Sequence, residues 1–181
     1  GFPYLSLLPD CYSRYIIGWC LSVTLETEGP LEALQMGLAF YRSHRIGIKE
    51  LIHHSDRGIQ YASFKYTDLL KANKIRISMT QCGDPLHNAM AERVNNTVKN
   101  EWPYAYEDLG YEDSVKAVGN AITMYNTARP HSALDMRTPL QVVTGIMSNP
   151  LLSPTEADLT QMSLGGSSTP ADGIPPSVFH S

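Results

Sequence analysis

Residues 50–58, Glu50-Leu51-Ile52-His53-His54-Ser55-Asp56-Arg57-Gly58, combine a strand pattern with a turn pattern. The beginning of this stretch, Glu50 to His54, is a short and largely apolar run that predicts a strand, and Ser55 to Gly58 are typical of a turn. Asp56 therefore follows the predicted strand directly, where its side chain would project from the edge of a sheet. Gly58 would permit a sharp turn just after it.

The segments on either side alternate between strand and helix patterns. Two upstream apolar runs flank a segment of turn formers, which predicts a hairpin, and Pro30 suits the first turn of a helix. We expect strands at 5–8 and 15–21, a helix at 30–41, a strand at 50–54, a helix at 61–72, a strand at 75–79, and helices at 85–102 and 115–125. This order predicts a mixed α/β sheet flanked by helices, in which carboxylates at strand ends could meet in one site.

The helix expected from Pro85 has an apolar face and a polar face. The apolar stripe is Leu86, Met90, Val94 and Val98, and the polar face carries Asn88, Glu92, Asn95, Asn96 and Lys99. Glu92 follows Asp56 after a gap of 35 residues. A strand-end Asp and a helical Glu are suitable ligands for Mg²⁺, but a complete site usually needs a third ligand. Such an isolated pair is more often solvated surface charge, so both interpretations stay open at this point.

Three motifs in order resemble insertion-sequence transposases with a retroviral-integrase-like core. Residues 53–61 resemble the H-S-D-x-G-x-Q-Y signature around the second catalytic Asp of that family, and residues 84–95 resemble its motif around the catalytic Glu. The gap of 35 residues matches the family's D-D-35-E spacing. Residues 125–134 resemble its closing Y-N-x-x-R-P-H-x-x-L element, so the resemblance covers roughly residues 4–145.

The resemblance implies an RNase H-like mixed sheet flanked by helices and an enzyme that cleaves and joins DNA with two Mg²⁺ or Mn²⁺ ions. Asp56 and Glu92 correspond to the second and third metal-binding carboxylates. Lys99 corresponds to a lysine that contacts DNA in related integrases, although a solvated helix charge is equally compatible. Asn88 and Asn95 could order a metal-bound water or contact DNA, and Arg129 could contact phosphate. Each of these three could equally have a surface or packing role.

The first catalytic Asp of the family lies on a central strand that precedes the hairpin, and we expect that strand to be missing from this chain. Asp10 matches instead an Asp of the hairpin turn, in a D-x-x-S-R pattern, where its side chain would accept hydrogen bonds from nearby backbone N–H groups. The loss of a central strand would leave its neighbours unpaired. We therefore expect the chain to be an N-terminally truncated core that is inactive by itself.

Composition separates a core from a tail. We predict a catalytic core at 1–147 and a disordered tail at 148–181, which is rich in Pro, Ser, Thr and Gly. No apolar run approaches the roughly 18 residues of a membrane span. The net charge is −4, whereas residues 42–99 carry ten Lys and Arg against five Asp and Glu, which is compatible with DNA contact. The three cysteines form no C-x-x-C pair, which suits a reducing cytoplasm. The resemblance implies a bacterial cytoplasmic protein that is associated with the nucleoid when it is bound to DNA.

The sequence leaves three functions open. The first is DNA transposition by the intact parent protein, which would be a polynucleotidyl transferase. For this function the resemblance implies that the partners are the DNA ends of the element and the target DNA. It also implies self-association on DNA and a helix-turn-helix N-terminal region or partner protein. The second is a decayed remnant without catalysis, at most a weak DNA-binding or oligomerising module. The third is an RNase H-like nuclease that only hydrolyses DNA. His54 could be a ligand or a general base, or simply a strand-end histidine.

Overall fold

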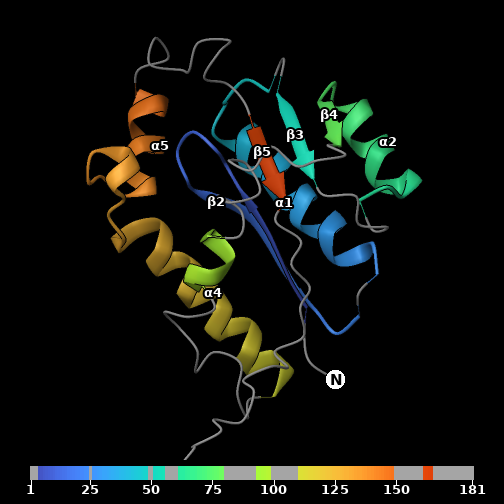
Figure 1. Ribbon diagram of the computed structural model, residues 1–181, viewed down its shortest axis with the longest axis horizontal. Helices are drawn as coiled ribbons and strands as arrows, with labels where there is room; N and C mark the ends of the chain where they lie inside the picture. Colours follow the sequence, from blue (N-terminus) through green and yellow to red (C-terminus); the bar gives the residue numbers. More distant parts are fainter. Residues whose placement is uncertain are drawn as a thin grey trace, which may run out of the picture.

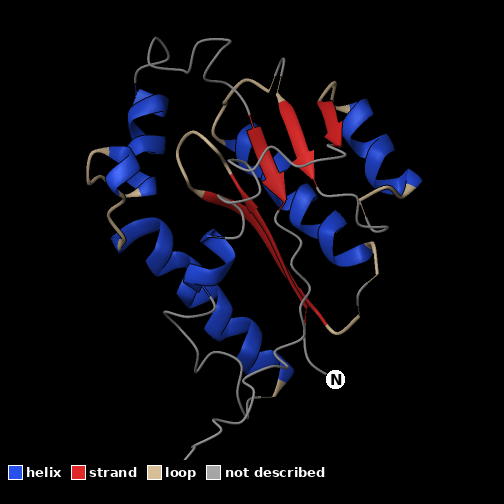
Figure 2. Cartoon of the chain, in the orientation of Figure 1, coloured by secondary structure: helices blue, strands red, loops and turns tan. Residues whose placement is uncertain are grey.

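Strands and helices alternate in nearly the predicted order in the computed structural model (Figures 1 and 2). The structure describes residues 4–24, 26–48, 51–55, 61–79, 93–98, 110–148 and 161–164. The elements are β1 (Tyr4–Pro9), β2 (Ile16–Ser22), α1 (Glu28–Ser43), β3 (Ile52–Ser55), α2 (Phe64–Ala72), β4 (Arg76–Met79), α4 (Tyr111–Ala128), the 3₁₀ turn η2 (Ser132–Leu134), α5 (Pro139–Ser148) and β5 (Gln161–Leu164). Residues 93–98, within the helix predicted at 85–102, are also helical.

β1 and β2 form the predicted antiparallel hairpin. The register passes from Leu8 opposite Gly18 to Pro9 opposite Ile16, so Ile17 is an extra residue in β2. Such a bulge bends the strand and increases its local twist. Asp10 holds the turn: its Oδ2 accepts hydrogen bonds from the Ser13 N–H at 2.7 Å and the Ser13 hydroxyl at 2.5 Å. The predicted turn role of Asp10 is thereby confirmed.

β3 is paired on both sides, so the expectation that the neighbours of a missing strand would lie unpaired is wrong for this strand. It runs parallel to β4 on one side and parallel to β5 on the other. β5 comes from the segment predicted to be disordered; the other residues after Ser148 lie outside the described part. Strand pairing is made by the main chain, so a segment without strong β propensity can still add to an open sheet edge.

The hairpin lies between two helical layers (Figure 2). Leu5 and Leu7 of β1 point into one apolar cluster and Leu8 into the other. The first cluster, lined by α1 and α2, consists of Leu8, Ile17, Leu34, Leu38, Tyr41, Leu51, Tyr61, Tyr66, Leu70 and Ile75. The second, lined by residues 93–98 and α4, consists of Leu5, Leu7, Ile16, Leu21, Val94, Val98, Val118, Ile122 and Tyr125. The mixed α/β class is thus as predicted.

α1 approaches β2 at Gly18. A Cβ atom at this position would lie 2.0 Å from the backbone oxygen of Ala33 and 3.0 Å from the backbone nitrogen of Gly37. Only a residue without a side chain therefore lets the helix backbone lie this close to the strand.

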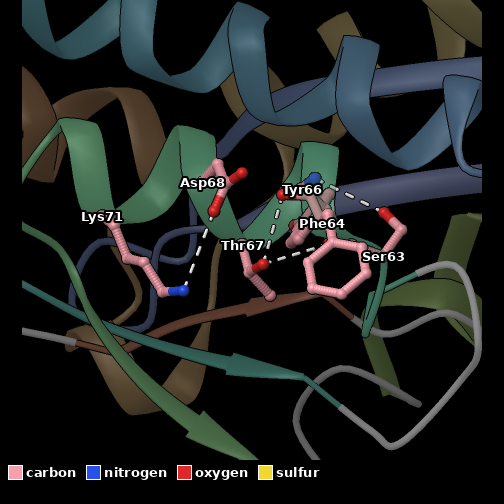
Figure 3. Close-up of polar contacts among 6 residues, drawn as sticks. All are labelled: Ser63, Phe64, Tyr66, Thr67, Asp68 and Lys71. Carbon is pink, nitrogen blue, oxygen red and sulfur yellow. Dashed lines mark hydrogen bonds and ion pairs between the residues drawn. The ribbon is translucent and has the colours of Figure 1, made fainter.

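α2 begins with a capped N-terminal turn (Figure 3). The Ser63 hydroxyl accepts a hydrogen bond from the Tyr66 N–H at 3.4 Å, and the Thr67 hydroxyl donates to the Ser63 carbonyl at 3.1 Å. Ser63 is thus the N-cap that satisfies a free N–H of the first turn. Tyr66, which is fully buried, then points from this turn towards β3.

Candidate metal and DNA site

The end of β3 leads directly to the predicted catalytic Asp. β3 ends at Ser55, and Asp56 lies outside the described residues. His53 and Ser55 are both buried and alternate with the half-buried His54, so they share one face of the strand. The predicted position of Asp56 directly after a strand therefore agrees with the bounds of β3.

His53 is a buried, neutral histidine that is positioned by α2. Its Nε2 lies 3.1 Å from the Tyr66 hydroxyl, and the two rings are 5.5 Å apart. Burial, together with the nearby His54, lowers the pKa of His53 from 6.5 to about 3. His53 therefore remains uncharged at neutral pH and fixes the strand that leads to Asp56.

We expect this histidine to make the fold sensitive to acid. Below pH 6.5 the unfolded His53 binds a proton that the folded residue does not bind until about pH 3, so stability falls as the pH drops through this window. The slope is up to about 1.4 kcal/mol per pH unit. Urea unfolding at pH 7, 6 and 5 measures it. His53→Gln should flatten the slope, whereas the control His44→Gln, on the exposed end of α1, should not; equal slopes for wild type and His53→Gln would contradict this account.

The helix that follows the predicted catalytic Glu packs on the hairpin. Val94 and Val98 are buried in the second cluster, as the predicted apolar stripe requires. Asn95 is only 2% exposed, so it is a buried amide and not one on a solvated helix surface. Glu92, Asn88 and Lys99 lie outside the described residues, and their roles stay predictions.

The closing motif begins on α4 and contacts the edge of β2. Asn126 is buried; its Oδ1 accepts a hydrogen bond from the Ile16 N–H at 2.8 Å, and its Nδ2 donates to the Ile16 carbonyl at 3.1 Å. The Tyr125 ring meets the His131 ring edge to face at 5.1 Å. Arg129 is half-buried at the C-terminal end of α4, directly before Pro130. The first part of this motif therefore joins α4 to the sheet, a role that sequence reasoning did not assign to Asn126.

Asn126→Ala should destabilise the fold by about 2–4 kcal/mol, because both polar groups of Ile16 would lose their partner while buried. The free energy of unfolding in urea measures the effect. Asn120→Ala, at an exposed position of the same helix, is the matched control and should change it by less than about 0.5 kcal/mol. Equal effects of the two substitutions would show that the Asn126 contacts do not stabilise the fold.

The two carboxylates predicted to hold a metal, Asp56 and Glu92, both lie outside the described residues. Among the side chains that are described, no three His, Cys, Asp or Glu residues are grouped to hold an ion. The hydroxyl oxygen of Ser55, next to Asp56, is buried and has no hydrogen-bond partner in the described part of the chain. A hydroxyl oxygen of this kind is a hard donor, the class of ligand that Mg²⁺ prefers.

The hairpin, the parallel strands and the two helical layers define a class, the integrase catalytic core. Two family models, both described as "Integrase core domain", match residues 1–85 and 73–139. Their two ranges include every described element from β1 to η2.

Transposases of bacterial insertion sequences are similar to this chain. The IS904 transposase of Lactococcus lactis is 32% identical over 143 residues, which cover 77% of this chain and 54% of that protein. InsF of IS3A from Escherichia coli K12 is 35% identical over 133 residues, covering 73% and 45%, and the IS629 transposase of Shigella sonnei is 38% identical over 99 residues, covering 55% and 32%. The chain belongs to this family, the insertion-sequence transposases with an integrase-like core. It spans between about a third and just over half of the length of these relatives.

Solved retroviral integrases share the fold. The catalytic core of BIV integrase superposes with a TM-score of 0.62 at 15% identity, covering 82% of this chain and 90% of that one. The HTLV-2 integrase catalytic core, in complex with magnesium, superposes with a TM-score of 0.50 at 17% identity, covering 76% and 84%. These likenesses, together with the observed strands and helices, confirm the predicted RNase H-like class. In the described part of the chain, no helix is both long and apolar enough to span a membrane.

Proposed function

We propose that this chain is the C-terminal part of the catalytic core of a transposase that cleaves and joins DNA. The observation that carries the proposal is the end of β3 at Ser55, directly before Asp56, on a strand that is paired on both sides. The helical segment after Glu92 is anchored to the same core by Val94 and Val98. Family membership adds the functional context, because the relatives are named transposases.

In this proposal Asp56 and Glu92 hold divalent metal ions, either Mg²⁺ or Mn²⁺. When bound, two such ions would polarise the scissile phosphate and activate the attacking and leaving oxygens. The role of the chain itself is to position the two residues that bind the metal. His53 and Tyr66 would hold the strand before Asp56, and packing of the helical residues 93–98 would orient Glu92. The integrase core of HTLV-2 in complex with magnesium supports the choice of metal.

The DNA contacts are proposed for the polar residues of the same region. Lys99 and Asn88 would face the phosphate backbone, and Arg129 would bind phosphate at the end of α4. Asn95 is buried, so its proposed contribution is to orient a neighbouring ligand or water inside the site. DNA ends and target DNA are the partners, with self-association on DNA and a helix-turn-helix region or partner protein that recognises the ends.

The catalytic centre would need a third carboxylate besides Asp56 and Glu92. The chain spans at most 54% of the length of these relatives, so we propose that it acts as part of a larger protein and is inactive by itself. If the chain is instead a decayed remnant, a larger protein that contains it would not join DNA.

A joining assay separates the three functions. A full-length protein that contains this chain is incubated with labelled element-end DNA, target DNA and Mn²⁺, and the products are separated by size. Joined products support the transposase. Shortened DNA without joined products would identify a nuclease, and unchanged DNA would favour the remnant.

A further inference from the structure

β5 lies between β3 and the hairpin (Figure 1). It pairs in parallel with β3 along its whole length, from Ile52 opposite Gln161 to Ser55 opposite Leu164. On its other side β5 contacts β1. Among the described strands, β5 is thus the one that connects the β3–β4 pair to the β1–β2 hairpin.

The side of β3 that β5 covers would otherwise have open main-chain groups. With β5 in place, His53 and Ser55 are buried, so water has little access to the middle and the end of this strand in the folded chain. Buried N–H and C=O groups need partners, and a parallel strand supplies them along the whole edge. Because the pairing uses the main chain, a segment such as Gln-Met-Ser-Leu can supply it, provided that it contains no proline.

We propose that the space between β1 and β3 is a strand-acceptor site, which residues 161–164 of this same chain occupy. The tail segment would then be a structural part of the sheet and not a free appendage. Leu164 pairs with Ser55, the residue that precedes Asp56 in the sequence, and none of the four residues of β5 is acidic. β5 therefore fills this place in the sheet without adding a carboxylate. A strand that supplied a third catalytic carboxylate here would have to displace β5. That displacement rests on the proposed function, whereas the pairing of β5 with β3 does not.

The test uses the full chain with Met162→Pro and Ser163→Pro combined. Successive N–H groups along a strand point to opposite sides, so one of these two faces β3 and the double substitution removes it. The matched control is Ser167→Pro with Ser168→Pro, which places the same two prolines outside β5. Hydrogen exchange followed by mass spectrometry reports protection separately for residues 51–55 and for α4.

We expect the amides of β3 to exchange at least about tenfold faster in the Met162/Ser163 variant than in the wild type and the control. Protection of α4 should persist if the loss is local; unfolding of the whole variant while the control stays folded would also support the proposal. Unchanged protection of β3 would overturn it. This readout needs no activity, so its failure is distinct from failure of the proposed function.

A second measurement tests the acceptor site directly. A fluorescent peptide of residues 158–167 is titrated against the Met162/Ser163 variant and against the wild type. We expect binding to the variant to be at least about tenfold tighter, because the wild-type site is already occupied by its own strand. A peptide that carries the same two prolines should not bind. Equal binding to both proteins, or binding to neither, would overturn the proposal.

Discussion

Gly18→Ala should destabilise the protein by at least about 3 kcal/mol and lower its melting temperature by about 10 °C. The added Cβ would lie 2.0 Å from the Ala33 backbone oxygen, far inside the sum of the atomic radii. The atoms nearest to it all belong to the backbone of α1, so no side-chain rotation relieves the clash. The helix would have to move away from β2, and the first apolar cluster would lose its packing against Ile17.

Thermal unfolding of the Gly18 variant beside Gly145→Ala measures this effect. Gly145 lies inside α5, and a Cβ there would have no atom within 4 Å. The control should be neutral or should stabilise the protein by about 0.5–1 kcal/mol, since alanine favours a helix. A melting temperature of Gly18→Ala within about 2 °C of the wild type would show that α1 does not approach β2 this closely.

Asp56→Asn and Glu92→Gln should each reduce DNA joining at least about a hundredfold in a full-length protein that contains this chain. Each change removes the charge of a carboxylate while keeping its size. Metal-assisted stabilisation of the transition state contributes several kcal/mol, and each 1.36 kcal/mol corresponds to about a tenfold change in rate. Joining should be measured with Mn²⁺, which accepts the same oxygen ligands.

The control for these variants is Asp68→Asn. Asp68 is an exposed carboxylate on α2 that lies 3.7 Å from Lys71 (Figure 3), and its loss should leave joining unchanged. Circular dichroism should show that all three variants keep the wild-type fold. Full joining activity in either the Asp56 or the Glu92 variant would remove that residue from the proposed site.

Much of the fold could be predicted because its signals are local. The alternating apolar residues of the hairpin and the helical spacing of α1 each bury one face, and the resulting elements agree with the predicted ones. α4 is longer than expected, from Tyr111 to Ala128, because Gly110 serves as its N-cap and acidic residues occupy its first turn. Such acids favour a helix N-terminus but add no apolar periodicity, so the predicted helix began too late.

Features that depend on contacts distant in sequence could not be predicted. β5 is held by main-chain pairing with a strand that lies more than a hundred residues earlier, and its side chains carry little signal. Asn126 contacts Ile16, which lies 110 residues earlier in the sequence. The resemblance of the closing motif included Asn126 but did not predict this contact. For the candidate site, the position of Asp56 directly after a strand followed from turn residues, whereas burial of Asn95 depends on how its helix packs.

Asp56 and Glu92 should bind the same metal centre, and anomalous X-ray diffraction from crystals soaked in Mn²⁺ would locate the bound ions. We expect an anomalous peak beyond the end of β3, with carboxylate oxygens of both residues about 2.1–2.2 Å from a bound ion. Crystals of the Glu92→Gln variant should lose the peak or show it weakened. Peaks only at other carboxylates, with Asp56 and Glu92 too far apart to share a centre, would contradict the account.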